Sequence, residues 1–110
     1  MDCLFCKIIA GEIPGKVVYE DDKVFAFRDV NPQAPTHVLI VPRKHMKNVL
    51  ECDAETAAAL VNGIQKVAEL EKVDADGFRV LSNCGKNGYQ SVEHLHIHLL
   101  GGKQLSERMD

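Results

Sequence analysis

Three histidines within five positions are the feature of this sequence best able to do chemistry. In the segment His94–Leu100, the residues His94, His96 and His98 alternate with aliphatic residues. Alternation with a period of two is typical of a half-buried strand, on which the three imidazoles share one face about 6.6 Å apart. Such a row can supply acid–base, nucleophilic or metal-binding groups. An edge strand with solvated histidines is the plain alternative.

Two cysteines near the N-terminus have the spacing of a metal or redox motif, since Cys3 and Cys6 are separated by two residues. A redox role would need a thioredoxin-like βαβ context, which the sequence lacks. A structural zinc would need two further ligands, for which His45 and His94 are the candidates, and such a site would tie distant parts of one fold together. Surface cysteines without a role are the alternative.

The loop at residues 83–91, before the histidines, contains glycines that let backbone N–H groups approach an anion. Asn83, Gln90 and Ser91 add side-chain donors. Such loops are often only turns, but beside three histidines this one predicts a phosphate or acyl site. Asp29 closes an expected strand, where a carboxylate can accept two hydrogen bonds from a ribose diol, although its position alone favours an ordinary turn residue. His37 begins another strand and is either a core histidine or a site residue.

The elements that must position these residues indicate an α+β fold. Strands are expected at residues 17–20, 23–29, 37–41, 78–82 and 94–100, and a short helix within residues 3–10. One long helix is predicted from about Glu55 to Glu71, with Asp53 as its N-cap. Its apolar face is predicted to consist of Ala57, Leu60, Val61, Ile64, Val67 and Ala68. Short loops between neighbouring strands favour an antiparallel sheet.

Size and composition limit the possible functions. A length of 110 residues suits one domain, so residues 1–110 are expected to form a single domain. The formal net charge is −3 and no basic stripe is present, which argues against long nucleic acids but not against small nucleotides. The N-terminus has no signal-peptide pattern and no apolar stretch approaches membrane-spanning length, so we expect no membrane contact and a cytoplasmic location. The four cysteines are then expected to be thiols or metal ligands.

Four ordered motifs together resemble the histidine triad family. The segment His94–Leu100 fits the family signature His-φ-His-φ-His-φ-φ, in which φ is apolar. Residues 5–14, 29–37 and 42–45 look like the opening and the middle of the family's sequences. The segment Gln90-Ser91-Val92, just before the triad, resembles the corresponding segment in the Hint-type branch of purine nucleoside phosphoramidases.

This resemblance implies a five-stranded antiparallel sheet with one long helix and a short N-terminal helix, in a homodimer whose sheets join. It implies a hydrolase for AMP- or GMP-type phosphoramidates or related nucleoside monophosphate esters. His96 would attack the α-phosphorus, its other ring nitrogen donating to the carbonyl of His94, and water would hydrolyse the nucleotidyl-histidine intermediate. No metal is implied at the reacting centre.

The resemblance also implies the ligand contacts. Asp29 would bind the ribose hydroxyls beside Val30. The phosphate would be held by Asn83, Ser91 and His98, by backbone amides near Tyr89 and Gln90, and with His37 nearby. The pocket for the purine would be lined by Phe5, Ile8, Ile13, Phe27, Val30 and Leu39. One structural zinc per chain is expected on Cys3, Cys6, His45 and His94, because the distantly related galactose-1-phosphate uridylyltransferases place similar ligands this way.

Two departures from the family pattern matter. Tyr89 stands where Hint-type members usually have glycine, and the tail at residues 103–110 lacks their Trp-Pro-Pro-Gly-like ending, so a preference for a particular amine does not carry over. Two other functions stay open from the residues. One is a metallohydrolase with the triad as zinc ligands, since histidines two apart on a strand can chelate zinc. The other is a nucleotide-responsive binding module whose hydrolysis is incidental.

Overall fold

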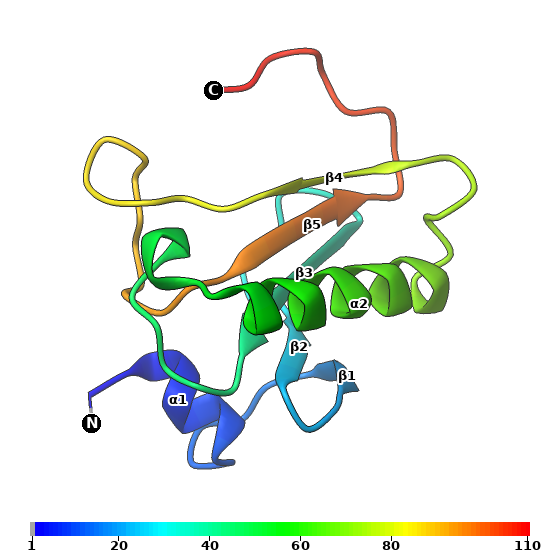
Figure 1. The fold of residues 1–110 in the computed structure, drawn as a ribbon. Helices are drawn as coiled ribbons and strands as arrows, with labels where there is room; N and C mark the ends of the chain where they lie inside the picture. The colour runs from blue at the N-terminus through cyan, green and yellow to red at the C-terminus, as the bar shows by residue number, and fades with distance from the viewer. Residues whose placement is uncertain (1) are drawn as a thin grey trace.

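The strand β3 (Thr36–Pro42) is the middle of a five-stranded antiparallel sheet with the order β1-β2-β3-β5-β4 (Figure 1). The computed structural model describes residues 2–110. The other elements are α1 (Leu4–Ile9), β1 (Val17–Glu20), β2 (Val24–Arg28), the short 3-10 helix η1 (Val49–Glu51), α2 (Ala54–Leu70), β4 (Phe78–Leu81) and β5 (Ile97–Gly101). The predicted α+β fold, with five antiparallel strands, one long helix and one short N-terminal helix, is confirmed.

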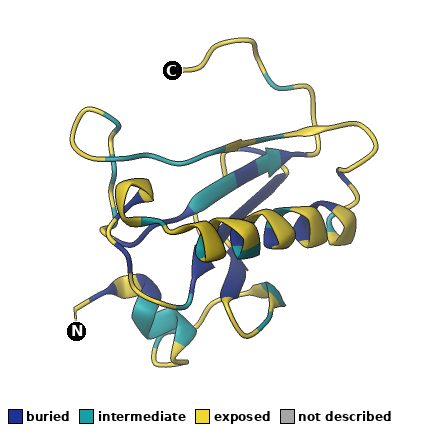
Figure 2. Ribbon diagram, in the orientation of Figure 1, coloured by how far each residue is buried: buried dark blue, intermediate teal, exposed yellow. Residues whose placement is uncertain are grey.

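The two faces of the sheet bury two different clusters. Along β2, Val24 and Ala26 point to the face that α2 covers, whereas Phe25 and Phe27 point to the face that α1 covers. Side chains of a strand alternate between faces, so a strand covered on both sides is apolar throughout. Every residue of β3 is buried for this reason, and Figure 2 shows β2 and β3 as the dark centre of the fold. No helix within residues 2–110 is long and apolar enough to cross a membrane.

The helix α2 begins where the sequence predicts, because the side chain of Asp53 accepts a hydrogen bond of 2.7 Å from the amide of Thr56. The predicted apolar face is only partly correct. Leu60, Val67 and Ala68 are buried and Ile64 packs against them, but Ala57 and Val61 are exposed. The buried stripe instead includes Gly63, which lets the helix approach the sheet: a Cβ atom there would lie 3.2 Å from side-chain atoms of Ile40 and Val24.

The histidine segment is a strand only in its second half, so the prediction of a strand from residue 94 is wrong for its first three residues. β5 begins at Ile97. Before it, the amide of Leu95 donates to the carbonyl of Met46 at 2.7 Å, so the chain bonds to the loop after β3 and not to a neighbouring strand. The predicted alternation holds, because Leu95 and Leu99 lie in the α2-side cluster and the imidazoles point the other way.

Candidate active site and metal centre

Four imidazoles line the α1 face of the sheet beside α1. The rings of His96 and His98 are 5.0 Å apart between centroids, and the Nε2 atom of His37 lies 2.9 Å from the Nδ1 atom of His98. The ring of Phe5 meets His96 edge-on at 5.1 Å. His94 and His96 are almost fully buried, with exposed fractions of 0% and 3%. Buried imidazoles keep fixed hydrogen-bond partners, so each ring can be assigned a tautomer.

Three backbone groups decide which ring nitrogens carry protons. A carbonyl oxygen can only accept, so the Nε2 atom of His94 donates to Pro42 at 2.8 Å, and the Nδ1 atom of His96 donates to the carbonyl of His94 at 2.7 Å. The amide of Gln33 donates to the Nδ1 atom of His37 at 3.0 Å. In neutral His37 the proton is therefore on Nε2, which donates to the Nδ1 atom of His98.

These assignments give the triad rings different chemistry. The Nε2 atom of His96 keeps its lone pair, which makes it a nucleophile, whereas the Nε2 atom of His98 carries a proton that can be donated to an anion. Burial, with smaller contributions from His96 and His37, lowers the pKa of His98 to about 4. Burial also lowers the pKa of His37, and the nearby Asp29 carboxylate opposes that change. Both rings are thus neutral at pH 7, as the chain of hydrogen bonds requires.

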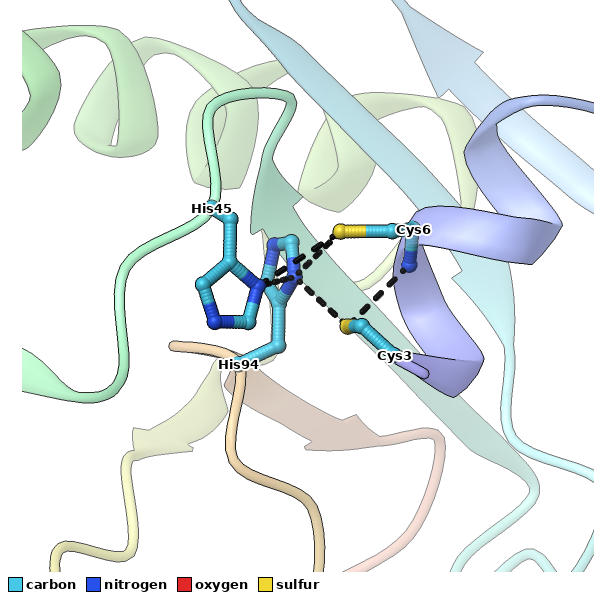
Figure 3. Close-up of side chains that lie close together, drawn as sticks. All are labelled: Cys3, Cys6, His45 and His94. Atoms are coloured by element: carbon cyan, nitrogen blue, oxygen red, sulfur yellow. Dashed lines mark hydrogen bonds between the residues drawn. The ribbon is translucent and has the colours of Figure 1, made fainter. Parts of the chain in front are cut away.

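A second cluster brings together the two cysteines, His45 and His94 (Figure 3). The Nδ1 atom of His94 lies 3.2 Å from both the sulfur of Cys3 and the Nδ1 atom of His45, and 3.5 Å from the sulfur of Cys6. The sulfur of Cys6 is 3.5 Å from the Nδ1 atom of His45. A tetrahedral zinc with ordinary Zn–S and Zn–N bonds has ligand–ligand distances of about 3.3–3.8 Å. The four donor atoms therefore fit one tetrahedral metal ion.

The surroundings of His94 also suit a metal ligand, because its other nitrogen donates to a backbone carbonyl and so leaves the lone pair of Nδ1 on the cluster. Burial and the neighbouring Cys3 raise the pKa of the Cys6 thiol to about 11, and a bound cation would reverse that effect by stabilising the thiolate. The four residues that the sequence suggested as zinc ligands do lie in one cluster, drawn from α1 and its N-cap, the loop after β3 and the approach to β5. Their role as ligands stays a prediction.

Asp29, His37 and His98 form another group whose possible ligand atoms lie within 4.8 Å of one another. The surroundings here differ from those of His94. The Nδ1 atom of His37 accepts from the amide of Gln33, so the ring proton of His37 is on its Nε2 atom, which is the nitrogen that faces Asp29 and His98. A metal-binding histidine instead donates through its outer nitrogen. This group is therefore a hydrogen-bond chain.

An open cavity of about 580 Å³ lies beside this chain, at the ends of β2 and β3. Asp29, Val30 and His37 line it, and Val30 is almost completely exposed. One carboxylate oxygen of Asp29 accepts from the amide of Asn31 at 2.8 Å, and the other lies 3.5 Å from the Nε2 atom of His37. The other residues predicted to wall a base are less accessible: Phe5, Phe27 and Leu39 are buried, and Ile8 and Ile13 are half-buried.

The loop between β4 and β5 is closed by its own hydrogen bonds. The amide of Tyr89 donates to Lys86 at 3.1 Å and the amide of Gln90 donates to Gly85 at 3.0 Å. These two amides would have to exchange partners to hold a phosphate. Ser91 is exposed at the end of the loop, and the side chain of Asn83 donates to the carbonyl of Gly88 at 2.7 Å. The predicted roles of these residues in binding stay predictions.

Sequence reasoning missed three groups that position the imidazoles. Gln33 and Pro42 act through their backbone N–H and C=O, which every such residue carries, so only the fold can select them. Ser82, whose hydroxyl donates to the carbonyl of His96 at 2.7 Å, differs because its side chain makes the contact, and a hydroxyl at the end of a predicted strand could have suggested it.

Comparison with known proteins agrees with this arrangement. Residues 10–105 match the family model described as the HIT domain. A purine nucleoside phosphoramidase from Escherichia coli is 46% identical over 107 residues, which cover 94% of this chain and 90% of that protein. A 14 kDa zinc-binding protein from Zea mays is 48% identical over 108 residues, which cover 94% of this chain and 84% of that protein.

Solved structures give the same result. A HIT family hydrolase from Clostridium thermocellum is similar with a TM-score of 0.94 and 42% identity, over 98% of this chain and 96% of that one. A histidine triad protein from Clostridium difficile is similar with a TM-score of 0.93 and 47% identity, over the same shares of the two chains. Because both the family model and these relatives span nearly all of its length, the chain belongs to the histidine triad (HIT domain) family.

Proposed function

We propose that this protein hydrolyses purine nucleoside phosphoramidates, or related nucleoside monophosphate esters, through a nucleotidyl-histidine intermediate on His96. The observation that carries the proposal is the 2.7 Å hydrogen bond from the Nδ1 atom of His96 to the carbonyl of His94. It fixes the tautomer whose Nε2 lone pair is nucleophilic without deprotonation. The similarity to a protein named purine nucleoside phosphoramidase supports the substrate class.

In the proposed reaction, the Nε2 atom of His96 attacks the α-phosphorus, and the bond from phosphorus to nitrogen breaks as the nitrogen takes up a proton from solvent and leaves as the amine. The N–H at Nε2 of His98 and the hydroxyl of Ser91 hold the phosphate oxygens, and Asn83 completes this contact. Water then attacks the phosphorus and loses a proton to solvent, the bond from phosphorus to His96 breaks, and the nucleoside monophosphate is released. Because the backbone carbonyl of His94 holds His96 in one tautomer, this ring needs no reorganisation between the two steps.

The cavity at the ends of β2 and β3 is the proposed nucleoside site. A carboxylate accepts from two vicinal hydroxyls, so Asp29 is assigned to the ribose. Val30 offers an exposed apolar surface to the base. The family resemblance assigns Phe5 and Phe27 to the same wall, and both are buried in the cluster on the α1 side of the sheet.

We also propose one structural zinc per chain on Cys3, Cys6, His45 and His94. The support is the near-tetrahedral set of distances, the carbonyl partner of His94, and the similarity to a protein named as zinc-binding. Such a closed four-ligand site has no open position for a substrate, so zinc would stabilise the fold and take no part in the reaction.

The metallohydrolase alternative is disfavoured by the direction of the triad rings. His94 faces the cysteines, the Nδ1 atom of His96 faces a carbonyl, and the Nδ1 atom of His98 faces His37. The three rings do not converge on one point among the described residues. A binding module without turnover is the second alternative, and a kinetic measurement separates it from the hydrolase.

The homodimer is likewise a proposal. β4 is an edge strand, and its Phe78 and Val80 are 37% and 42% exposed. An edge strand has backbone N–H and C=O groups on its outer side to which a second copy can add its own edge strand. We expect Val80→Lys to convert a dimer into a monomer in light scattering; a monomeric unmodified protein would contradict the proposal. The cytoplasmic location stays a prediction.

The test of the proposed function is His96→Ala with an adenosine phosphoramidate as substrate. We expect the rate to fall by several orders of magnitude, because the covalent route is lost. The affinity for AMP should be roughly unchanged, because it also depends on Asp29 and the cavity. Quenched-flow mass spectrometry of the unmodified protein should find an added AMP on the peptide that contains His96. If His96→Ala keeps more than about a tenth of the rate, less than ~1.4 kcal/mol of the barrier depended on this side chain, and the assignment is wrong.

A further inference from the structure

Tyr89 is a large side chain in an unfavourable backbone conformation with almost no packing to compensate for it. Its φ is 60° and its exposed fraction is 86%. A left-handed conformation crowds the Cβ atom of any residue except glycine. Lys72, with φ 59°, is the other such residue among those described, and it has an ordinary reason because it follows the end of α2. Tyr89 ends no helix.

The loop imposes this conformation on Tyr89. A Cβ atom at Gly88 would lie 2.5 Å from the carbonyl of Cys84, so the chain doubles back tightly just before the tyrosine. The side chain of Gln90, just after it, donates to the carbonyl of Lys47 at 2.7 Å and accepts from the amide of Gly85 at 3.0 Å. Glycine at position 89 would meet the same geometry without strain. A strained residue in an over-determined loop points to a use for its side chain.

The loop lies on the side of the nucleophile that the nucleoside cavity does not occupy. That cavity is at β2 and β3, whereas the loop joins β5 to the edge strand β4, which lies on the other side of β5 from β3 (Figure 1). Ser82, at the start of the loop, donates to the carbonyl of His96. Ser91 and Asn83, which the proposed reaction places on the phosphate oxygens, belong to the same loop. A phosphorus atom at His96 therefore lies beside this loop when its nucleoside is in the cavity, and the leaving group, which departs opposite the attacking Nε2 atom, is the part of the substrate that the cavity does not enclose.

We propose that Tyr89 is a specificity-determining residue that contacts the leaving group and favours conjugates whose leaving group is aromatic. An exposed phenol ring on a rigid loop offers a flat apolar face, and aromatic pairs gain from stacking beyond the area they bury. A small leaving group such as ammonia or methylamine would not reach this face. The proposal rests on the proposed function and names the substrate class of that same site.

The test compares two adenosine 5′-phosphoramidates, one of tryptamine and one of methylamine, in four proteins: the unmodified chain, Tyr89→Phe, Tyr89→Asn and Tyr89→Gly. The quantity is the ratio of kcat/KM for the two substrates, in which any general effect of a variant on the loop cancels. We expect Tyr89→Phe to keep the ratio, and Tyr89→Asn and Tyr89→Gly to lower it about three- to tenfold. Asparagine tolerates φ above zero, so it removes the ring without adding strain.

The proposal is overturned if this ratio is the same in all four proteins. It is also overturned if Tyr89→Phe lowers the ratio. A second measurement separates this outcome from a failure of the proposed function. An analogue of the tryptamine conjugate with a P–CH2 bond in place of P–N cannot be hydrolysed, and its affinity relative to AMP can be measured by calorimetry. If the unmodified protein hydrolyses neither phosphoramidate, the proposed function fails. The proposal for Tyr89 then depends on whether Tyr89→Asn lowers that relative affinity about three- to tenfold.

Discussion

Removing the proposed zinc should loosen the attachment of α1 to the sheet, and Cys6→Ser is the change that tests it. Cys3 is the N-cap of α1 and Cys6 lies within it, whereas His45 follows β3 and His94 precedes β5. Hydrogen bonds already join the segments of His45 and His94. The metal would add a link from both segments to α1, beside the packing around Phe5. Metal binding that exists only in the folded state adds directly to the free energy of unfolding.

The magnitude follows from this linkage. A metal at 100 to 1,000 times its dissociation constant stabilises the folded state by about 2.7–4.1 kcal/mol. For a domain near 100 residues, about 1 kcal/mol corresponds to roughly 4 °C in Tm, so the loss of the metal should lower Tm by roughly 10–15 °C. The hydrophobic cluster on the α2 side of the sheet contains none of the four residues, so we expect Cys6→Ser to fold, with α1 less stable than the sheet.

The assay is elemental analysis with thermal unfolding. Protein purified without chelators should carry about one equivalent of zinc, and a strong chelator should reproduce the Tm of Cys6→Ser without changing that of the variant. Cys52→Ser is the matched control, since Cys52 is half-buried and lies outside the cluster. Zinc well below one equivalent, or the same Tm change in both variants, would refute the reasoning.

Asp29→Ala should weaken the binding of AMP by about 1.5–3 kcal/mol and abolish the discrimination between AMP and deoxy-AMP, because a charged acceptor for the ribose hydroxyls is lost. Calorimetric titration with Asp22→Ala as the control checks this prediction. Equal affinities of the unmodified protein for both nucleotides would exclude this role of Asp29. The free energy of unfolding should fall as the pH drops from about 6.5 toward 4. Burial lowers the pKa of folded His98 to about 4, so the unfolded chain binds a proton in this range that the folded one does not. His98 should contribute at most about 1.4 kcal/mol per pH unit to the slope of the free energy of unfolding against pH. Denaturant titrations at several pH values should find a shallower slope in His98→Asn than in the unmodified protein. Identical slopes in the two proteins would contradict this account.

The periodicity of the sequence was sufficient for most of the fold. The expected strand at residues 23–29 is present as β2, and its side chains alternate between the two faces, so Val24 and Phe25 lie in opposite clusters. The carboxylate of Asp53 predicted the start of α2 because an N-cap is a local interaction. The face of α2 was less predictable. Ala57 and Val61 are apolar but exposed, since the rotation of a helix about its axis depends on where Gly63 lets it approach the sheet.

The chemistry of the site was divided between sequence and tertiary structure. Residue types and spacing identified the histidine triad and the cysteine pair as candidate functional residues. The family resemblance supported Cys3, Cys6, His45 and His94 as the expected zinc ligands. The roles of the imidazoles depended on contacts between distant segments. Gln33 and Pro42 set the tautomers of His37 and His94 through backbone groups, which all residue types share. A side-chain pattern carries no record of such partners, so only the packed chain decided which nitrogen of each of these rings carries the proton and which keeps its lone pair.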